Sequence, residues 1–163
     1  MLRTHRTSEL GRVREGRRVK VAGWISSVRD QGSITFLVLR DGWGEVQVTA
    51  KKGEVPDELL ERLHAIPPHS SVVVGGTVRM DQRAPGGVEV IPSSVQLVSR
   101  ARKQPPFSVY GGNLPALDRR LDIRAVDLRR VKARAIFRVR HAALQAIRDF
   151  FTSRGLTEVQ TPK

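Results

Sequence analysis

Five segments rich in valine and isoleucine occupy the first hundred residues, and they constrain the fold more than any other feature. Glycine or proline separates most of them, which favours short turns and antiparallel pairing. A helix is expected between the third and fourth segments, because Pro56 precedes leucines at helical spacing and Pro67-Pro68 follows them. The expected strands cover 18–29, 33–40, 45–50, 70–80 and 88–98, the last interrupted near Pro92.

The order of three strands, a helix and two strands is typical of the five-stranded OB-fold barrel, a module that binds oligonucleotides. Another small barrel or a sandwich remains open on this pattern alone. We therefore predict a mainly β fold with an OB-fold domain over residues 1–100.

The remainder of the chain has a different pattern. Residues 101–127 contain three prolines and two glycines, too many for a regular element, and we predict a hinge linker there. From residue 128 apolar side chains recur every three or four positions, which predicts a long helix ending near Gly155. The segment 156–160 resembles the start of a strand, so 128–163 is predicted to open a further domain. The apolar stripe of the helix consists of Val131, Ala135, Val139, Ala143, Ile147 and Phe150.

Charge and composition narrow the function. The formal net charge is +13, and residues 101–163 carry +9 of it, which indicates a polyanionic partner, nucleic acid first. The chain has no cysteine, and its four histidines lack metal-ligand spacing, so no metal site is expected. No phosphate loop or nucleophile motif occurs, so no catalytic residue is expected either. The absence of a long apolar run and of a signal-peptide block leads us to expect a cytoplasmic protein without membrane contact.

Three blocks of residues resemble a known family. The stretch from Val21 to Val48 is similar to the first strands of the anticodon-binding domain of aspartyl-tRNA synthetases, with Arg29-Asp30, Phe36 and Val46-Gln47-Val48 as matching pieces. A second match runs from Leu121 to Arg140, and a third, from Arg148 to Lys163, looks like motif 1 of class II synthetases. The blocks occur in order over essentially the whole chain, and the opening Arg3-Thr4-His5 leans toward the archaeal-type branch.

The resemblance implies an OB-fold joined by a hinge to a catalytic domain, of which this chain contains only the start. In such enzymes aspartate and ATP, with Mg²⁺, give aspartyl-adenylate, and the aspartyl group passes to the tRNA 3′ end. The motif 1 helix normally packs against its twin in a homodimer. Motifs 2 and 3 are not in this sequence, so we expect the chain alone not to catalyse and to need no cofactor itself.

The resemblance also implies an anticodon site. Phe36 corresponds to the aromatic that stacks on the middle base, uracil, and Gln47 to the amide that reads this base. Arg29 corresponds to the arginine near the first base, guanine, and Glu89 to the carboxylate near the third base. Both faces of segment 33–40 are largely apolar, and on composition alone a buried Phe36 is favoured.

Two further positions bear on the choice between tRNA-Asp and tRNA-Asn. Strict archaeal-type members tend to carry tryptophan where Ser26 stands and lysine where Pro85 stands, and this sequence departs at both. Proline there resembles the relaxed members, so we hypothesise a non-discriminating parent that also charges tRNA-Asn.

Other functions remain open on the sequence alone. A free-standing OB-fold module could bind tRNA or another single strand without enzymatic activity. A ligase of the same subclass for asparagine or lysine is a second alternative, although the stretch 121–129 favours aspartate. An unrelated OB-fold protein is the third.

Overall fold

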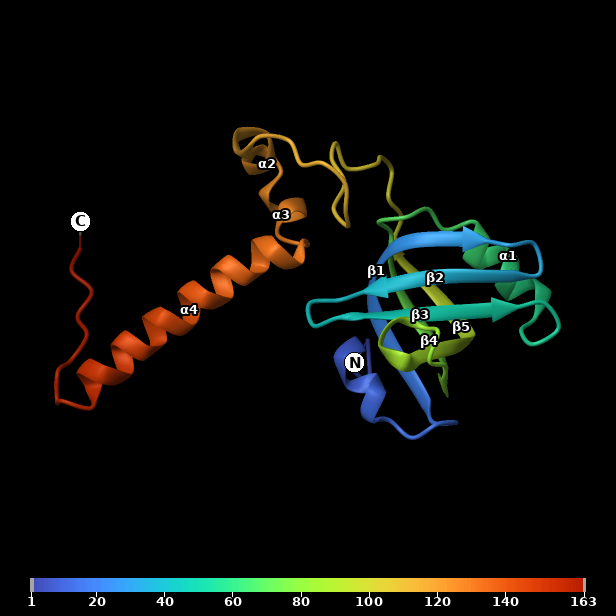
Figure 1. Ribbon diagram of the computed structural model, residues 1–163, viewed down its shortest axis with the longest axis horizontal. Helices are drawn as coiled ribbons and strands as arrows, with labels where there is room; N and C mark the ends of the chain where they lie inside the picture. Colours follow the sequence, from blue (N-terminus) through green and yellow to red (C-terminus); the bar gives the residue numbers. More distant parts are fainter. Residues whose placement is uncertain (1, 163) are drawn as a thin grey trace. The chain divides into compact units, whose positions relative to one another are not determined.

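The computed structural model describes residues 2–162 and divides into two compact units, Met1–Gln104 and Pro105–Lys163 (Figure 1). Five strands of the first unit form a closed barrel in the order β1-β2-β3-β5-β4. Neighbouring strands are antiparallel except β3 and β5, which close the barrel as a parallel pair. The predicted OB-fold is confirmed. The strands are β1 (Arg18–Asp30), β2 (Ile34–Arg40), β3 (Glu45–Lys51), β4 (Ser71–Met80) and β5 (Val88–Ser99).

Alternation along the strands separates a core face from an outer face. On β2, Thr35, Leu37 and Leu39 point inward and are buried, whereas Phe36 between them is only half-buried. The expectation of a buried Phe36 is therefore wrong. Both faces of this strand are apolar, so the closure of the barrel, and not the residue pattern, decides which face of the strand lies against the core. Helix α1 (Asp57–His64) adds to the core with Leu59, Leu60 and Leu63.

The predicted irregularity at Pro92 is confirmed. Pro92 opposes Gly76 of β4, and the register of the β4–β5 pair shifts between Gly75 and Gly76. A side chain at Gly76 would overlap the carbonyl oxygen of Ile91, so only glycine allows the two strands to approach here. Ser93, next to Pro92, is the residue left without a partner at this bulge, so the ladder of hydrogen bonds is interrupted beside the proline, which has no N–H to donate.

Asp41, at the end of β2, joins the β2–β3 turn to the N-terminal 3₁₀ helix η1 (Thr7–Arg12). Its carboxylate accepts hydrogen bonds from Thr7 N and Oγ1 (2.9 and 2.6 Å), Trp43 N (2.7 Å) and Gly44 N (2.9 Å). Burial disfavours the charged form of Asp41, but these hydrogen bonds outweigh burial, and the pKa of Asp41 lies below its usual value. The N-terminal segment is thus held to the barrel by a charged group.

In the second unit, helices occupy part of the segment predicted as an irregular linker. Residues 117–127 form α2 (Leu117–Asp122) and α3 (Arg124–Asp127), so the linker prediction is wrong there, because the prolines and glycines that motivated it all precede residue 117. Asp127 is buried and lies between three arginines: its oxygens are 3.1 Å from Arg130 Nη1 and 3.6 Å from both Arg120 Nη1 and Arg124 Nη1.

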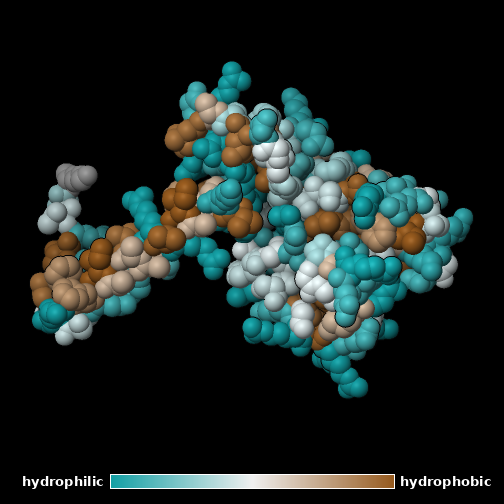
Figure 2. Space-filling view, in the orientation of Figure 1, coloured by the Kyte–Doolittle hydropathy of each residue, from teal (hydrophilic) through white to brown (hydrophobic). Residues whose placement is uncertain are grey.

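The long helix is confirmed as α4 (Val131–Thr152), and Gly155 follows it with a φ of 79°. The strand predicted over 156–160 does not form, because the described part of this unit supplies no second strand to pair with it. Hydrophobic side chains gather along α4 in Figure 2, and many of them are exposed. None of the helices described within residues 2–162 has both the length and the apolar character needed to span a membrane.

Candidate nucleic-acid interface

The candidate site lies on the outer face of the barrel, where side chains of β1, β2, β3 and β5 stand in two cross-strand rows. In the first row Arg29 opposes Phe36, and Phe36 opposes Thr49. In the second row Val38 opposes Gln47, which opposes Glu89 across the parallel β3–β5 pair. Arg29 and Glu89, 60 positions apart in the chain, are thus brought to the same side of the barrel.

Arg29 and Phe36 form the open end of this surface. The Cζ atom of Arg29 lies 5.1 Å from the centroid of the Phe36 ring, a cation–π arrangement. Arg29 is exposed and Phe36 half-buried, so the aromatic ring is anchored in the sheet and reachable from solvent. An anchored ring beside a guanidinium is suited to stacking an unpaired base and to binding its phosphate or its edge.

Gln47, Thr49, Arg79 and Glu89 form a hydrogen-bonded group at the other end, here called the Glu89 cluster. Gln47 Nε2 donates to Glu89 Oε2 and to Thr49 Oγ1, both at 3.1 Å. Thr49 Oγ1 also donates to Glu89 Oε2, and Arg79 Nε donates to Glu89 Oε1 at 2.7 Å. Glu89 is only 1% exposed, so the carboxylate lies beneath Gln47 rather than at the surface.

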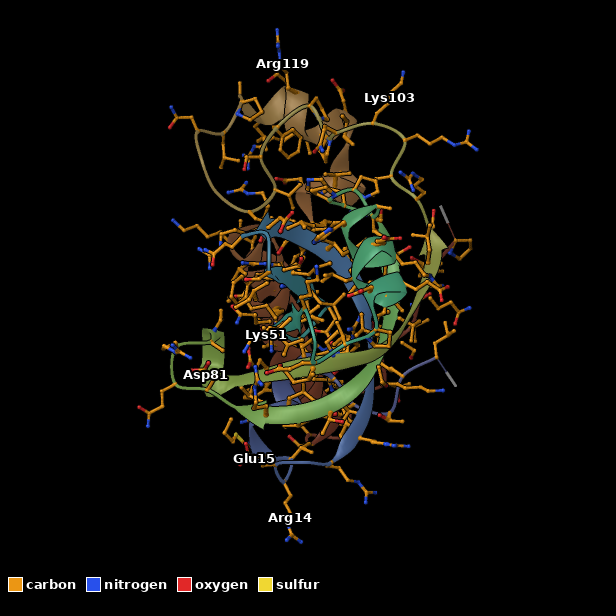
Figure 3. The ribbon with its side chains drawn as sticks, turned by 90° about the vertical axis from the view of Figure 1, so that its right-hand side faces the viewer. Arg14, Glu15, Lys51, Asp81, Lys103 and Arg119 are labelled. Atoms are coloured by element: carbon orange, nitrogen blue, oxygen red, sulfur yellow. The ribbon has the colours of Figure 1, made fainter. Side chains whose placement is uncertain are left out.

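Arg79 is the cation of this cluster. Burial disfavours its charge, but the hydrogen bond and charge of Glu89, together with those of Glu54, outweigh burial, and the pKa of Arg79 is raised above its ordinary value. Glu54 Oε2 lies 3.4 Å from Arg79 Nη1. Lys51, labelled in Figure 3, extends the chain of charges with its Nζ 3.6 Å from Glu54 Oε1.

Ser26 and Pro85, the two positions predicted to bear on the choice of tRNA, lie close in sequence to Arg29 and Glu89. Ser26 sits at a bulge of β1, where the register shifts between Ile25 and Ser27, and its Oγ donates to Val38 O at 3.1 Å. Pro85 is exposed and opens the short 3₁₀ helix η2 (Pro85–Gly87), which leads into β5. The structure therefore joins Arg29 to Phe36 and Gln47 to Glu89, and it gives no contact between Ser26 and Pro85.

Thr49 and Arg79 belong to this site but were not among the residues predicted from the sequence. The alternation of Glu45, Gln47 and Thr49 on one face of β3 was a signal for the first. Arg79 carried no local signal, because its partner Glu89 lies on the other strand of a β4–β5 pair whose register cannot be read from the sequence.

The described part of the chain contains no cluster of side chains that meets the requirements of a metal centre. Among residues 2–162 no three histidine, aspartate or glutamate side chains lie together in a way that would hold an ion. The described residues thus do not fit Mg²⁺, and no chemical step through Mg²⁺ and ATP is assigned to them.

The closed five-stranded barrel, with a helix between its third and fourth strands, is an OB-fold. Comparison with known families agrees: residues 19–98 match the OB-fold nucleic acid binding domain, and residues 116–163 match the class II tRNA synthetases of the D, K and N type.

Individual relatives specify the family further. The chain is 42% identical over 163 residues to the aspartate–tRNA(Asp/Asn) ligase of Methanopyrus kandleri, covering 100% of this chain and 38% of that protein. It is also 42% identical to the aspartate–tRNA(Asp) ligase of Pyrococcus horikoshii, covering 100% and 37%. The crystal structure of asparaginyl-tRNA synthetase from Pyrococcus horikoshii with asparaginyl-adenylate is similar at a TM-score of 0.88 and 30% identity, covering 99% of this chain and 37% of that one.

The chain thus carries an OB-fold domain and a segment of a class II tRNA synthetase domain of the D, K and N type, and over its whole length it is similar to aspartate–tRNA ligases. It spans somewhat more than a third of the length of these relatives. The resemblance inferred from the three sequence blocks is thereby confirmed.

Proposed function

We propose that this chain recognises the tRNA anticodon as the N-terminal part of an aspartate–tRNA ligase. The whole enzyme activates aspartate with ATP and Mg²⁺ as aspartyl-adenylate and transfers the aspartyl group to tRNA. The observation that carries the proposal is the Arg29–Phe36 pair on the outer face of the barrel, in a chain that is 42% identical over its whole length to two aspartate–tRNA ligases.

Three side chains are proposed to contact the anticodon directly. Phe36 stacks on the middle base, uracil, and such stacking contributes about 1–3 kcal/mol per base. Gln47 hydrogen-bonds the edge of that uracil. Arg29 contacts the first base, guanine, whose O6 and N7 suit a guanidinium.

A direct contact between Glu89 and the third base stays a prediction. A carboxylate accepts from the amino group of cytosine and repels the oxygen of uracil. However, Glu89 is 1% exposed and already accepts from Gln47, Thr49 and Arg79. A third base would have to reach past these donors, so the burial of Glu89 weighs against a direct contact.

We further propose that the parent enzyme is non-discriminating and charges both tRNA-Asp and tRNA-Asn. Support comes from Pro85 in the β4–β5 loop and from the absence of tryptophan at Ser26. Overall sequence identity does not distinguish the two specificities, because an aspartate–tRNA(Asp/Asn) ligase and an aspartate–tRNA(Asp) ligase are both 42% identical to this chain.

Dimer formation and cellular location are proposals of the same kind. Val131, Val139 and Phe150 of α4 are 50–70% exposed, and in the whole enzyme a second copy would cover this helix. Cytoplasmic location follows from the proposed role in protein synthesis.

Binding of anticodon stem-loop RNA to the chain tests the proposal. We expect a GUC hairpin to bind at least about tenfold more tightly than a hairpin of the same stem with the anticodon CAG, given the stacking and edge contacts that would be lost. Equal affinity for the two hairpins would contradict anticodon recognition. For the non-discriminating parent, GUC and GUU hairpins should compete equally, and a tenfold or larger preference for GUC would contradict that part alone.

An immunoblot of the source cells separates the ligase from a free-standing binding module. A native band far above the 18.2 kDa of this chain supports the ligase. A band at 18.2 kDa would support the free-standing module instead.

A further inference from the structure

We propose that Glu89 and Thr49 hold the Gln47 amide in one orientation, so that Gln47 offers only its oxygen to the middle anticodon base. The middle position then selects a pyrimidine that donates from N3, as uracil does, over cytosine, whose N3 is an acceptor. This inference rests on the proposed function, because it concerns how Gln47 discriminates between bases.

The hydrogen bonds of the Glu89 cluster use both hydrogens of the Gln47 amide nitrogen. One points to Glu89 Oε2 and the other to Thr49 Oγ1, each over 3.1 Å. Thr49 has a single hydroxyl hydrogen, which it donates to Glu89, so toward Gln47 the hydroxyl oxygen acts as acceptor. The amide nitrogen of Gln47 therefore has no hydrogen left for a base, and its Oε1 is the group that remains available.

The opposite orientation of the amide is disfavoured by the same neighbours. Turning the Gln47 amide over would place Oε1 against the carboxylate of Glu89, which accepts hydrogen bonds and has none to donate in return. Glu89 is 1% exposed, so water cannot relieve this opposition of two acceptors. Arg79 Nε, 2.7 Å from Glu89 Oε1, holds the carboxylate from its other side, and Glu54 holds Arg79 in turn.

The fixed orientation determines which base fits. Uracil presents N3–H on its pairing edge and can donate to Gln47 Oε1, whereas N3 of cytosine is an acceptor and would oppose that oxygen. Stacking on Phe36 does not distinguish the two pyrimidines, because every base has a π face. Discrimination at the middle position is therefore assigned to the amide of Gln47, and Glu89, Thr49 and Arg79 act as positioning residues that touch no base.

Binding of three hairpins, GUC, GCC and GUU, tests the inference with the chain and two near-isosteric variants. The unaltered chain should prefer GUC over GCC by at least about tenfold, since a buried unpaired acceptor is costly. Glu89→Gln replaces the carboxylate by a group that can also donate, which lets the Gln47 amide turn over. The GUC over GCC preference should then fall to about threefold or less, on the same grounds. Thr49→Val frees one hydrogen of Gln47 and should lower the same ratio. Phe36→Ala is the control: it should weaken GUC and GCC equally and leave the ratio unchanged.

The possible outcomes distinguish a failure of the proposed Gln47 orientation from a failure of anticodon recognition. If both Glu89→Gln and Thr49→Val fold, by circular dichroism, and keep the full GUC over GCC preference, the inference is wrong and anticodon binding stands. If Glu89→Gln changes only the ratio of GUC to GUU, Glu89 reads the third base directly and the inference is again wrong. If the unaltered chain does not distinguish GUC from GCC, the proposed role of Gln47 fails. Should Glu89→Gln not fold, the ratio for Thr49→Val decides.

Discussion

Arg29 on β1 is the direct cross-strand partner of Phe36 on β2, and its guanidinium carbon lies 5.1 Å from the centroid of the phenylalanine ring. A cation–π contact at an exposed site contributes about 0.5–1 kcal/mol. Stacking of a base on an aromatic side chain contributes about 1–3 kcal/mol. A base can therefore displace the guanidinium from the ring, and the displaced Arg29 is then free to bind the neighbouring base. The pair is suited to exchange the guanidinium for a base on the accessible face of the ring.

Phe36→Ala should separate binding from folding. We expect affinity for the GUC hairpin to fall by about 5- to 150-fold, which corresponds to the loss of one stacked base. The midpoint of thermal unfolding should change little, because Phe36 is half-buried on the outer face. Leu37→Ala is the matched control on the core face: Leu37 is 2% exposed, and its truncation should cost about 2–5 kcal/mol of folding free energy. Collapse of the thermal transition in Phe36→Ala would show that Phe36 is a core residue.

Arg29→Lys should relax recognition of the first base while keeping the positive charge. Lysine lacks the planar pair of donors that matches O6 and N7 of guanine, so the preference for GUC over AUC should fall by about 1–3 kcal/mol. Competition between the two hairpins measures this change. Arg18→Lys, an exposed arginine at the other end of β1, is the control and should leave the preference as it is. An unchanged preference in Arg29→Lys would remove Arg29 from the site.

Asp41 should make the attachment of the N-terminal segment sensitive to acid. Its pKa is lowered on folding, so its contribution to stability is present above the unfolded-state value of 3.8 and is lost as pH falls through the folded-state value. Asp41→Asn should unfold at lower temperature at neutral pH and show a smaller further loss below pH 4 than the unaltered chain. Thermal unfolding across pH measures both effects.

Asp81→Asn provides the control for Asp41. The pKa of Asp81 is also lowered, mainly by hydrogen bonds from Arg83, but this pair lies on the β4–β5 loop. We expect its replacement to shift the thermal midpoint far less than Asp41→Asn does. Equal shifts in the two variants would mean that Asp41 does not hold the N-terminal segment in place.

Asp127→Ala should loosen the second unit. It would leave Arg120, Arg124 and Arg130 close together without their shared buried carboxylate, and breaking a buried ion pair costs about 3–5 kcal/mol. Hydrogen exchange of backbone amides in residues 117–130 should become faster while the barrel strands keep their protection. Unchanged exchange in this segment would show that the arginine–aspartate cluster does not stabilise it.

The strands could be predicted from the sequence because the apolar and polar residues that mark the two faces of a strand alternate within the strand itself. Val46 and Val48 alternate with Gln47. As this pattern indicates, the two valines face the core of the barrel and Gln47 faces outward. Phe36 could not be placed in this way, because its strand is apolar on both faces. The Glu89 cluster depends on the parallel pairing of Gln47 with Glu89, 42 residues further along the chain, and no local pattern fixes such a pairing.

The second unit shows the same division between local and long-range information. The apolar stripe from Val131 to Phe150 was sufficient to predict α4. The segment 156–160 has the composition of a strand, but a strand also needs a neighbouring strand for its backbone hydrogen bonds. Resemblance to a family added what the pattern could not, namely which polar side chains on the outer face to examine.

NMR chemical-shift mapping of the anticodon hairpin on the chain tests the central claim most directly. We predict that adding a GUC hairpin perturbs the amides of β1, β2 and β3 most strongly around Arg29, Phe36 and Gln47, with smaller changes on α1. A hairpin with the anticodon CAG should leave these amides unchanged at the same concentration. Perturbations concentrated on α1 or α4, or identical for both hairpins, would contradict anticodon recognition by the outer face of this barrel.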